Sequence, residues 1–127
     1  MKSPAGNSVS ANVFDKACPS RAALELIASK WALLIIPALA HGPVRNNELL
    51  RRIGGVSQKM LTQTLKELEQ SGLLIREDQH TVPPHVQYSL SPLGRSLSKA
   101  LVAVDQWAEQ HHAEIGAARK RFERRKK

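Results

Sequence analysis

The 127-residue sequence has one cysteine, few aromatic residues and no long apolar run. Its single cysteine, Cys18, excludes a disulfide within the chain and any zinc site built from several cysteines. No segment reaches the roughly 18 consecutive apolar residues of a membrane span, and Met1–Val13 lacks the basic start and apolar run of a signal peptide. We therefore expect a soluble, cytoplasmic protein without a membrane partner.

Apolar residues make up 42 % of the chain but aromatic residues only 4 %, so the core must be aliphatic. A chain of this length has room for one domain with one core. Residues 1–17 are rich in Ser, Asn, Gly and Ala without periodicity, which predicts a flexible segment. We expect a folded domain over residues 18–116 and a basic tail over residues 117–127.

The net charge of +8 is concentrated at one end of the chain. Arg119–Lys127 holds seven Lys or Arg residues against only Glu123, which leaves the rest nearly balanced. We expect this tail to be disordered in the free protein. It is either a solvated terminus or a segment that adds sequence-independent affinity for a polyanion, so DNA binding has to be argued from the body of the chain.

Two helices are expected before residue 41. Pro19 suits the first position of a helix, which makes Cys18 its N-cap. A second helix over about residues 30–40 is apolar on almost every side and should be the buried central helix. Pro37 lies inside it and should bend it.

A helix-turn-helix pattern follows. A short helix should begin at Asn46 as its cap, and Gly54 and Gly55 make a tight turn. Ser57 then caps a helix that extends to Ser71. Its leucines share one narrow arc, and the opposite arc is polar: Leu61, Leu65 and Leu68 against Lys59, Thr62, Gln63, Lys66 and Gln70. Such an arc can meet phosphate oxygens and base edges when the second helix enters the major groove.

After Gly72 the spacing of the apolar residues changes from the helical repeat to the two-residue repeat of a β-strand. Leu73–Arg76 predicts one strand, and His85–Leu90 predicts a second strand with alternating apolar and polar residues. The polar loop between them contains Pro83 and Pro84. We therefore expect a mainly α fold with a small β-hairpin (α+β), that is, a winged helix-turn-helix with the hairpin loop as the wing.

A long helix is expected from Ser91, its cap, to His112, about 33 Å in length. Its apolar residues fall on one side, and such a stripe exceeds what a small domain needs. The distal half should therefore pack against a second copy of the chain, which predicts a homodimer.

The segments CPSRAALELIASKWALLIIPAL, HGPVRNNEL, VSQKMLTQTLKELEQSGLLIRE and VPPHVQYSLSPLGRSL resemble the HxlR-type family of bacterial winged-helix transcription regulators, relatives of the MarR group. The resemblance covers roughly residues 18–97. It implies a homodimer that binds an inverted repeat in double-stranded DNA, with additional first and last helices that form the dimer interface. It also implies that residues 57–71 enter the major groove and that the wing lies near the minor groove.

These considerations give three sets of candidate residues. The predicted DNA-binding residues are Asn46, Asn47, Ser57, Gln58, Lys59, Thr62, Gln63, Lys66, Arg76, His80 and His85. The predicted dimer interface contains Leu24, Ile27, Leu97, Leu101, Val104, Trp107 and His111. The candidate sensor is Cys18, since some family members sense oxidants or electrophiles at such a cysteine.

Two functions remain open for Cys18. A lone cysteine is usually a small buried hydrophobic residue. A helix N-terminus with Arg21 nearby would instead favour the thiolate and make the residue a sensor. An oxidant or a small molecule is then the effector.

An enzymatic function is not expected. The five histidines are scattered, and the adjacent pair His111 and His112 cannot share a helix face as a metal-binding pair does. No phosphate loop or catalytic triad spacing stands out, and no cofactor is implied. The alternatives to a regulator are a winged helix that binds only proteins and a nonspecific nucleic-acid-binding protein.

Overall fold

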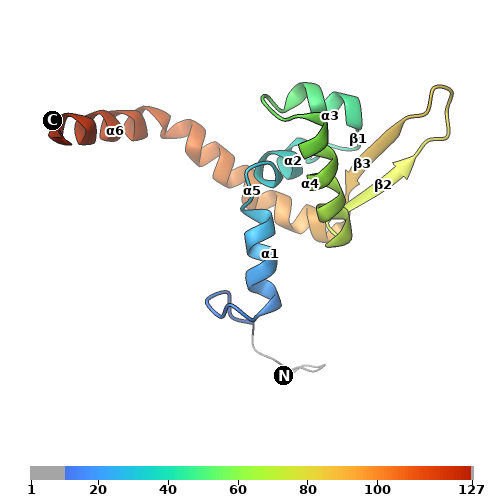
Figure 1. The fold of residues 1–127 in the computed structure, drawn as a ribbon, viewed down its shortest axis with the longest axis horizontal. Coiled ribbons are helices and arrows are strands. Elements are labelled where there is room, and N and C mark those ends of the chain that lie inside the picture. The colour runs from blue at the N-terminus through green and yellow to red at the C-terminus, as the bar shows by residue number, and fades with distance from the viewer. Residues whose placement is uncertain (1–10, 127) are drawn as a thin grey trace.

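The computed structural model describes residues 11–126, which form six helices and three short strands (Figure 1). The elements are α1 (Pro19–Ile27), α2 (Ala32–Ala38), β1 (Val44–Arg45), α3 (Asn46–Arg52), α4 (Gln58–Gln70), β2 (Leu74–Asp78), β3 (Val86–Leu90), α5 (Pro92–Gln110) and α6 (His112–Lys126). The predicted winged helix-turn-helix is confirmed. No helix within the described range is long and apolar enough to span a lipid bilayer.

The core is aliphatic and centres on α2. Ile35 and Ile36 are fully buried, and α2 packs against α1, α3 and α5. Leucines from α3 and α4 complete the cluster, which also includes Tyr88 from the sheet. The prediction of a buried central helix is confirmed, although this helix is shorter than expected, with Trp31 at its N-cap and Pro37 near its end.

The turn between α3 and α4 depends on glycine. Ile53 and Val56 are buried on either side of it, and Gly55 has a φ of +86°, a conformation that residues with a side chain rarely adopt. The start of α3 differs from the prediction, because Arg45 occupies the N-cap and Asn46 is already helical. No side-chain cap bond forms there, and α3 follows strand β1 without an intervening residue.

The sheet has three strands rather than the expected two, in the order β1-β3-β2 with antiparallel pairs. Strand β1 pairs Val44 with Tyr88 and Arg45 with Gln87. It was missed because two residues carry no periodic signal. Strand β2 reaches Asp78, two residues beyond the expected Arg76, because each of its residues finds a partner on β3.

The expected helix from Ser91 to His112 is α5, which ends at Gln110 with His111 as its C-cap, and a further helix, α6, follows from His112. Ser91 caps α5 as predicted, since its Oγ accepts a hydrogen bond from the Gly94 amide at 3.0 Å. The break lies at His111, whose Nδ1 is 2.9 Å from the Trp107 carbonyl, while His112 Nδ1 is 2.8 Å from the Glu109 carbonyl. The Trp107 carbonyl also accepts a hydrogen bond from the His111 amide at 3.1 Å, so this bond closes the last turn of α5 and the two imidazoles lie against carbonyls at its end.

The expectation of a disordered basic tail is wrong for residues 119–126, because they belong to α6. This segment has no proline, and Lys, Arg and Glu, which make up all of it except Phe122, are strong helix formers. Helix α6 extends from the end of α5 away from the body, and all its side chains are at least partly exposed (Figure 1). Charge alone was therefore a poor guide to its structure.

The N-terminal expectation also needs correction. Residues 11–17 form turns ahead of α1, because the side chains of Asn12 and Asp15 accept hydrogen bonds from the amides of Phe14 and Ala17 at 3.0 and 2.9 Å. Residues 1–10 of the predicted flexible segment lie outside the described range. Helix α1 begins at Pro19 with Cys18 at its N-cap, as predicted, and has no fully buried residue.

Candidate nucleic-acid interface

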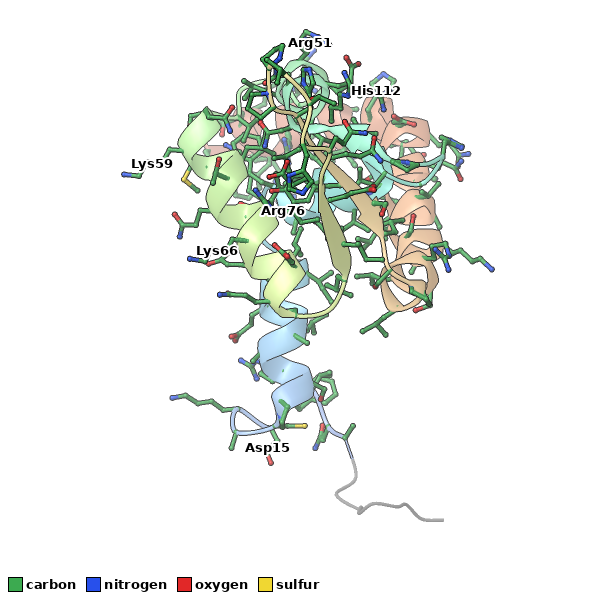
Figure 2. The ribbon with its side chains drawn as sticks, turned by 90° about the vertical axis from the view of Figure 1, so that its right-hand side faces the viewer. Asp15, Arg51, Lys59, Lys66, Arg76 and His112 are labelled. Atoms are coloured by element: carbon green, nitrogen blue, oxygen red, sulfur yellow. The ribbon has the colours of Figure 1, made fainter. Side chains whose placement is uncertain are left out.

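Helix α4 separates apolar and polar residues as the sequence predicts. Leu61, Leu65 and Leu68 are 0 % exposed and anchor the helix on the core. The opposite side is exposed and carries the predicted Lys59, Thr62, Gln63 and Lys66. Figure 2 shows Lys59 and Lys66 extending from this side of α4 into solvent. Burial of the leucines therefore fixes which side chains α4 can offer to a ligand.

The first turn of α4 is held by hydrogen bonds to side chains. Ser57 Oγ accepts a hydrogen bond from the Met60 amide at 3.1 Å, which confirms the predicted cap. Gln58 Nε2 donates to Thr62 Oγ1 at 2.9 Å, so these two predicted residues are already linked. Thr64 is buried and donates to the Met60 carbonyl at 2.8 Å. Its hydroxyl therefore faces the helix backbone and not the exposed side.

The wing is tied to the helix-turn-helix by a line of hydrogen bonds across the sheet. Arg45 Nε donates to Gln79 Oε1, Gln79 Nε2 donates to Gln87 Oε1, and Gln87 Nε2 donates to Glu77 Oε1, each at 3.2 Å. The predicted His80 lies beyond Gln79 with its side chain 85 % exposed. These bonds orient the base of the wing relative to β1 and α3.

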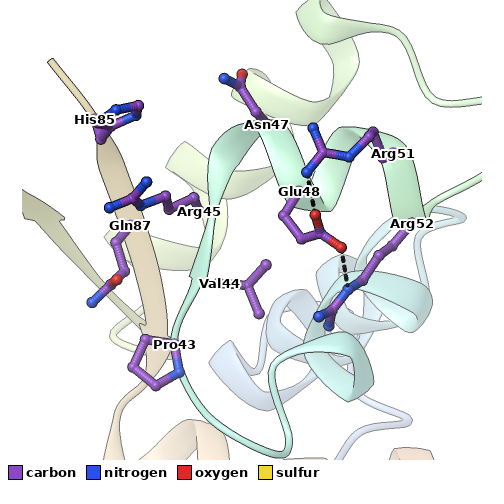
Figure 3. Close-up of a pocket in the computed structure, with 9 residues that line it drawn as sticks. All are labelled: Pro43, Val44, Arg45, Asn47, Glu48, Arg51, Arg52, His85 and Gln87. Carbon is purple, nitrogen blue, oxygen red and sulfur yellow. Dashed lines mark hydrogen bonds and ion pairs between the residues drawn. The ribbon is translucent and has the colours of Figure 1, made fainter. Parts of the chain in front are cut away.

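Two predicted residues line a hollow between β1, α3 and β3. Asn47 and His85 come from opposite walls of this hollow, which has a volume of about 490 Å³ (Figure 3). Asn46 is half-buried beside it on α3, and Arg76 is exposed on the neighbouring strand β2, close to α4 (Figure 2). The wing and helix candidates therefore fall into three groups: one on the outer side of α4 and the neighbouring β2, one around the hollow, and His80 in the exposed wing loop.

Three arginines of the hollow are not among the residues predicted from the sequence: Arg45, Arg51 and Arg52. Arg51 and Arg52 both bond to the Glu48 carboxylate, the latter through Nε at 3.0 Å (Figure 3). These hydrogen bonds lower the pKa of Glu48. The two basic residues in the last turn of α3 could have been recognised from the sequence. The opposite side of the hollow could not, because it forms only when β1 pairs with β3.

Cys18 is half-buried, and its sulfur has polar neighbours. Its Sγ lies 2.9 Å from Ser20 Oγ and accepts a hydrogen bond from the Asn12 amide at 3.4 Å. The Ser20 hydroxyl, followed by nearby amides, lowers the pKa of the Cys18 thiol. The expected guanidinium effect does not explain this shift, because Arg21 bonds Glu25 at 3.1 Å and only its backbone amide contributes.

The predicted dimer residues differ in exposure. Leu24, Val104 and Trp107 are 47 %, 51 % and 55 % exposed. Ile27 and Leu97 are half-buried and line an apolar groove of about 320 Å³ between α1 and α5. Leu101 is buried in the core of its own chain. His111 stacks on Trp107, with ring centroids 4.9 Å apart.

Known proteins with similar sequences and structures identify the family. Residues 26–115 match the family model described as HxlR-like helix-turn-helix. YtfH of Escherichia coli K12, described as an HTH-type transcriptional regulator, is 47 % identical over 108 residues, which are 85 % of this chain and 86 % of YtfH. The solved structure of ytfH from Salmonella typhimurium, also described as a transcriptional regulator, matches with a TM-score of 0.82 and 44 % identity. That match covers 87 % of this chain and 99 % of the other.

A third similar protein is described as a redox regulator. The redox regulator HypR in its oxidized form is 38 % identical, with a TM-score of 0.68, and the match covers 73 % of this chain and 96 % of HypR. Together with the family model and the architecture of helix, glycine turn, helix and wing, these similarities show that the chain belongs to the HxlR-like helix-turn-helix family.

Proposed function

We propose that the protein is a transcription regulator that binds a specific sequence of double-stranded DNA through α4. The observation that carries this proposal is the division of α4 into a fully buried leucine face and an exposed face with Lys59, Thr62, Gln63 and Lys66. Lysine and glutamine side chains can contact phosphates and base edges in the major groove. Similarity to proteins described as transcriptional regulators supports the same function.

In this proposal the protein acts as a homodimer on an inverted repeat. The exposed Leu24 of α1 and the exposed Val104 and Trp107 of α5 supply apolar surface for a second copy. A twofold axis through this surface would place two α4 helices on successive major grooves, about 34 Å apart. Binding at both half-sites would then require a fixed arrangement of the two subunits.

Cys18 is the proposed sensor. Its lowered thiol pKa increases the fraction of thiolate, which is the form that oxidants and electrophiles attack. Two Cys18 thiolates from two subunits could transfer two electrons to a diazene such as diamide, which takes up two protons and becomes a hydrazine, while the sulfurs form a disulfide. Similarity to the redox regulator HypR supports this part of the proposal.

The experiment is to sequence DNA recovered with the purified protein and to measure binding of the enriched duplex by mobility shift. Gln63→Ala should weaken binding by roughly 1 to 3 kcal/mol and relax specificity at one base position, if Gln63 reads a base. Lys66→Ala should weaken binding to all sequences to a similar extent, as expected for a phosphate contact.

Matched controls lie on α5, away from α4. Gln106→Ala and Lys99→Ala make the same changes at exposed positions and should leave binding unchanged. Wild-type affinity of both α4 variants would refute the assignment of this helix. A protein that binds no duplex would favour the alternative in which the winged helix binds only proteins.

A further inference from the structure

The polar hollow between β1, α3 and β3 lies apart from the exposed face of α4. We propose that this hollow, lined by Arg45, Arg51 and Arg52, is a binding site for a phosphate-class anion, either a DNA backbone phosphate or a free phosphate. The DNA form of the site rests on the proposed function. The free-anion form does not.

Each of the three arginines has guanidinium N–H donors that its described hydrogen bonds do not use. In the described residues Arg45 donates through Nε to Gln79, and Arg52 donates through Nε to Glu48 and through Nη1 to the Ala38 carbonyl at 3.5 Å. Arg51 uses one terminal nitrogen on Glu48, and its side chain is 70 % exposed. A guanidinium has several N–H donors in a plane, so part of each fork stays free for an oxyanion.

Two of the arginines, Arg51 and Arg52, already bind the same anionic group, the Glu48 carboxylate. Its two carboxylate oxygens bond Arg51 and Arg52 separately, so the two guanidinium groups are already turned toward one acidic group (Figure 3). Glu48 is the only carboxylate among the described residues that line the hollow. Three arginines against one carboxylate leave an excess of positive charge, which favours an anion with more than one charge.

An occupant would act on both DNA-binding elements. Arg45 holds Gln79 at the base of the wing, and Arg52 holds the end of α2 through Ala38. An anion on the terminal nitrogens of Arg45 would share this guanidinium with Gln79, which uses only Nε. Because His85 directly precedes β3 and Asn47 lies on α3, closure around the anion would draw the wing toward the helix-turn-helix.

The first arm of the test uses the full-length protein and inorganic phosphate without DNA. Phosphate is titrated at constant ionic strength while NMR follows the amide signals of Val44, Asn47 and Gln87. We expect saturable shifts at these positions. The Arg45→Gln/Arg51→Gln double variant should weaken phosphate binding roughly tenfold or more, because it removes two charge-assisted contacts.

A gain of affinity separates the proposal from misfolding. Glu48→Gln releases Arg51 and Arg52 from their carboxylate and should strengthen phosphate binding about threefold, since it removes one nearby negative charge. Lys99→Gln removes one positive charge from an exposed position outside the hollow and should leave phosphate binding as in the wild type.

The second arm measures affinity for a random-sequence duplex of about 30 base pairs over a range of salt concentrations. If a backbone phosphate occupies the hollow, Arg51→Gln should lower the log-log salt slope by about 0.9 and weaken binding to all sequences alike. Phosphate shifts with an unchanged slope would assign the site to a free anion, and a lower slope without phosphate shifts would assign it to DNA. Absence of both effects would overturn the proposal, whereas phosphate binding by a protein that binds no duplex would refute only the proposed function.

Discussion

Replacement of Gly94 by alanine should be the most damaging small substitution in the fold. Gly94 lies in the first turn of α5, where an added Cβ would be 2.1 Å from the Leu73 carbonyl oxygen and 3.3 Å from Leu90 Cδ2. The carbonyl belongs to the backbone of the residue just before β2 and cannot rotate away as a side chain would. Helix α5 would therefore have to move from the corner where Ser91 Oγ donates to the Gly72 carbonyl at 2.6 Å.

The magnitude follows from the competing effects. Alanine is the better helix former by roughly 0.5–1 kcal/mol. Forcing extra volume into a packed contact costs about 1–3 kcal/mol. Weakening the two hydrogen bonds of Ser91 Oγ, which donates to the Gly72 carbonyl and accepts from the Gly94 amide, costs roughly another 1 kcal/mol each. We expect Gly94→Ala to lower the free energy of unfolding by about 3 kcal/mol, which corresponds to a Tm about 10 °C lower for a domain of this size.

Circular dichroism at a fixed protein concentration, in thermal and urea unfolding, gives the measurement. The matched control is Gly116→Ala in α6, because no atom lies within 4 Å of its added Cβ. The control should leave the Tm unchanged or raise it slightly. If the two variants unfold at the same temperature, the close contact between α5 and Leu73 does not limit the stability of the fold.

Three further predictions concern the proposed function. The double variant Val104→Glu/Trp107→Glu should be monomeric by light scattering and should bind DNA weakly. A wild-type protein that is already monomeric would refute the dimer. Alkylation of Cys18 by iodoacetamide should reach half its maximal rate at a lower pH in the native protein than in urea, since hydrogen bonds to the sulfur lower the thiol pKa; equal midpoints would contradict this. Deletion of residues 119–127 should lower the log-log salt slope of binding for operator and random duplex alike. The slope should fall by about 0.9 for each DNA phosphate that the segment neutralises in the full-length protein. An unchanged slope would mean that α6 does not touch DNA.

The elements with strong periodicity were the predictable ones. The leucines of α4, its cap at Ser57 and the cap of α5 at Ser91 all follow from residue type and spacing. The exposed side of α4 was predictable for the same reason, because burial of Leu61, Leu65 and Leu68 leaves only one side free. The assignments of DNA-binding, sensor and dimer residues stay predictions, as do the domain boundaries.

The hollow could not be predicted, because it depends on contacts between distant segments. Strand β1 is only two residues long, and it joins the sheet because Val44 and Arg45 pair with residues more than 40 positions later. Arg45 and Gln87 face each other only through this pairing. In the sequence alone, Arg51 and Arg52 look like solvated residues at the end of a short helix. Their spacing of three and four residues from Glu48 favours ion pairs within that helix, but it does not indicate the opposite wall of the hollow.

The positions of the basic residues show why net charge alone is a poor measure of recognition. Lys59 and Lys66 project from the outer side of α4, whereas α6 begins at His112 on the other side of the molecule (Figure 2). Arg119–Lys127 carries +6 of the net charge of +8, and all but the last of these residues belong to α6, where the charge adds sequence-independent attraction if it meets DNA at all. Specific recognition instead requires a few polar side chains held in fixed positions, and the buried leucines of α4 provide that rigidity. Salt dependence and sequence preference should therefore respond to different substitutions, the first to α6 and the arginines of the hollow and the second to Gln63.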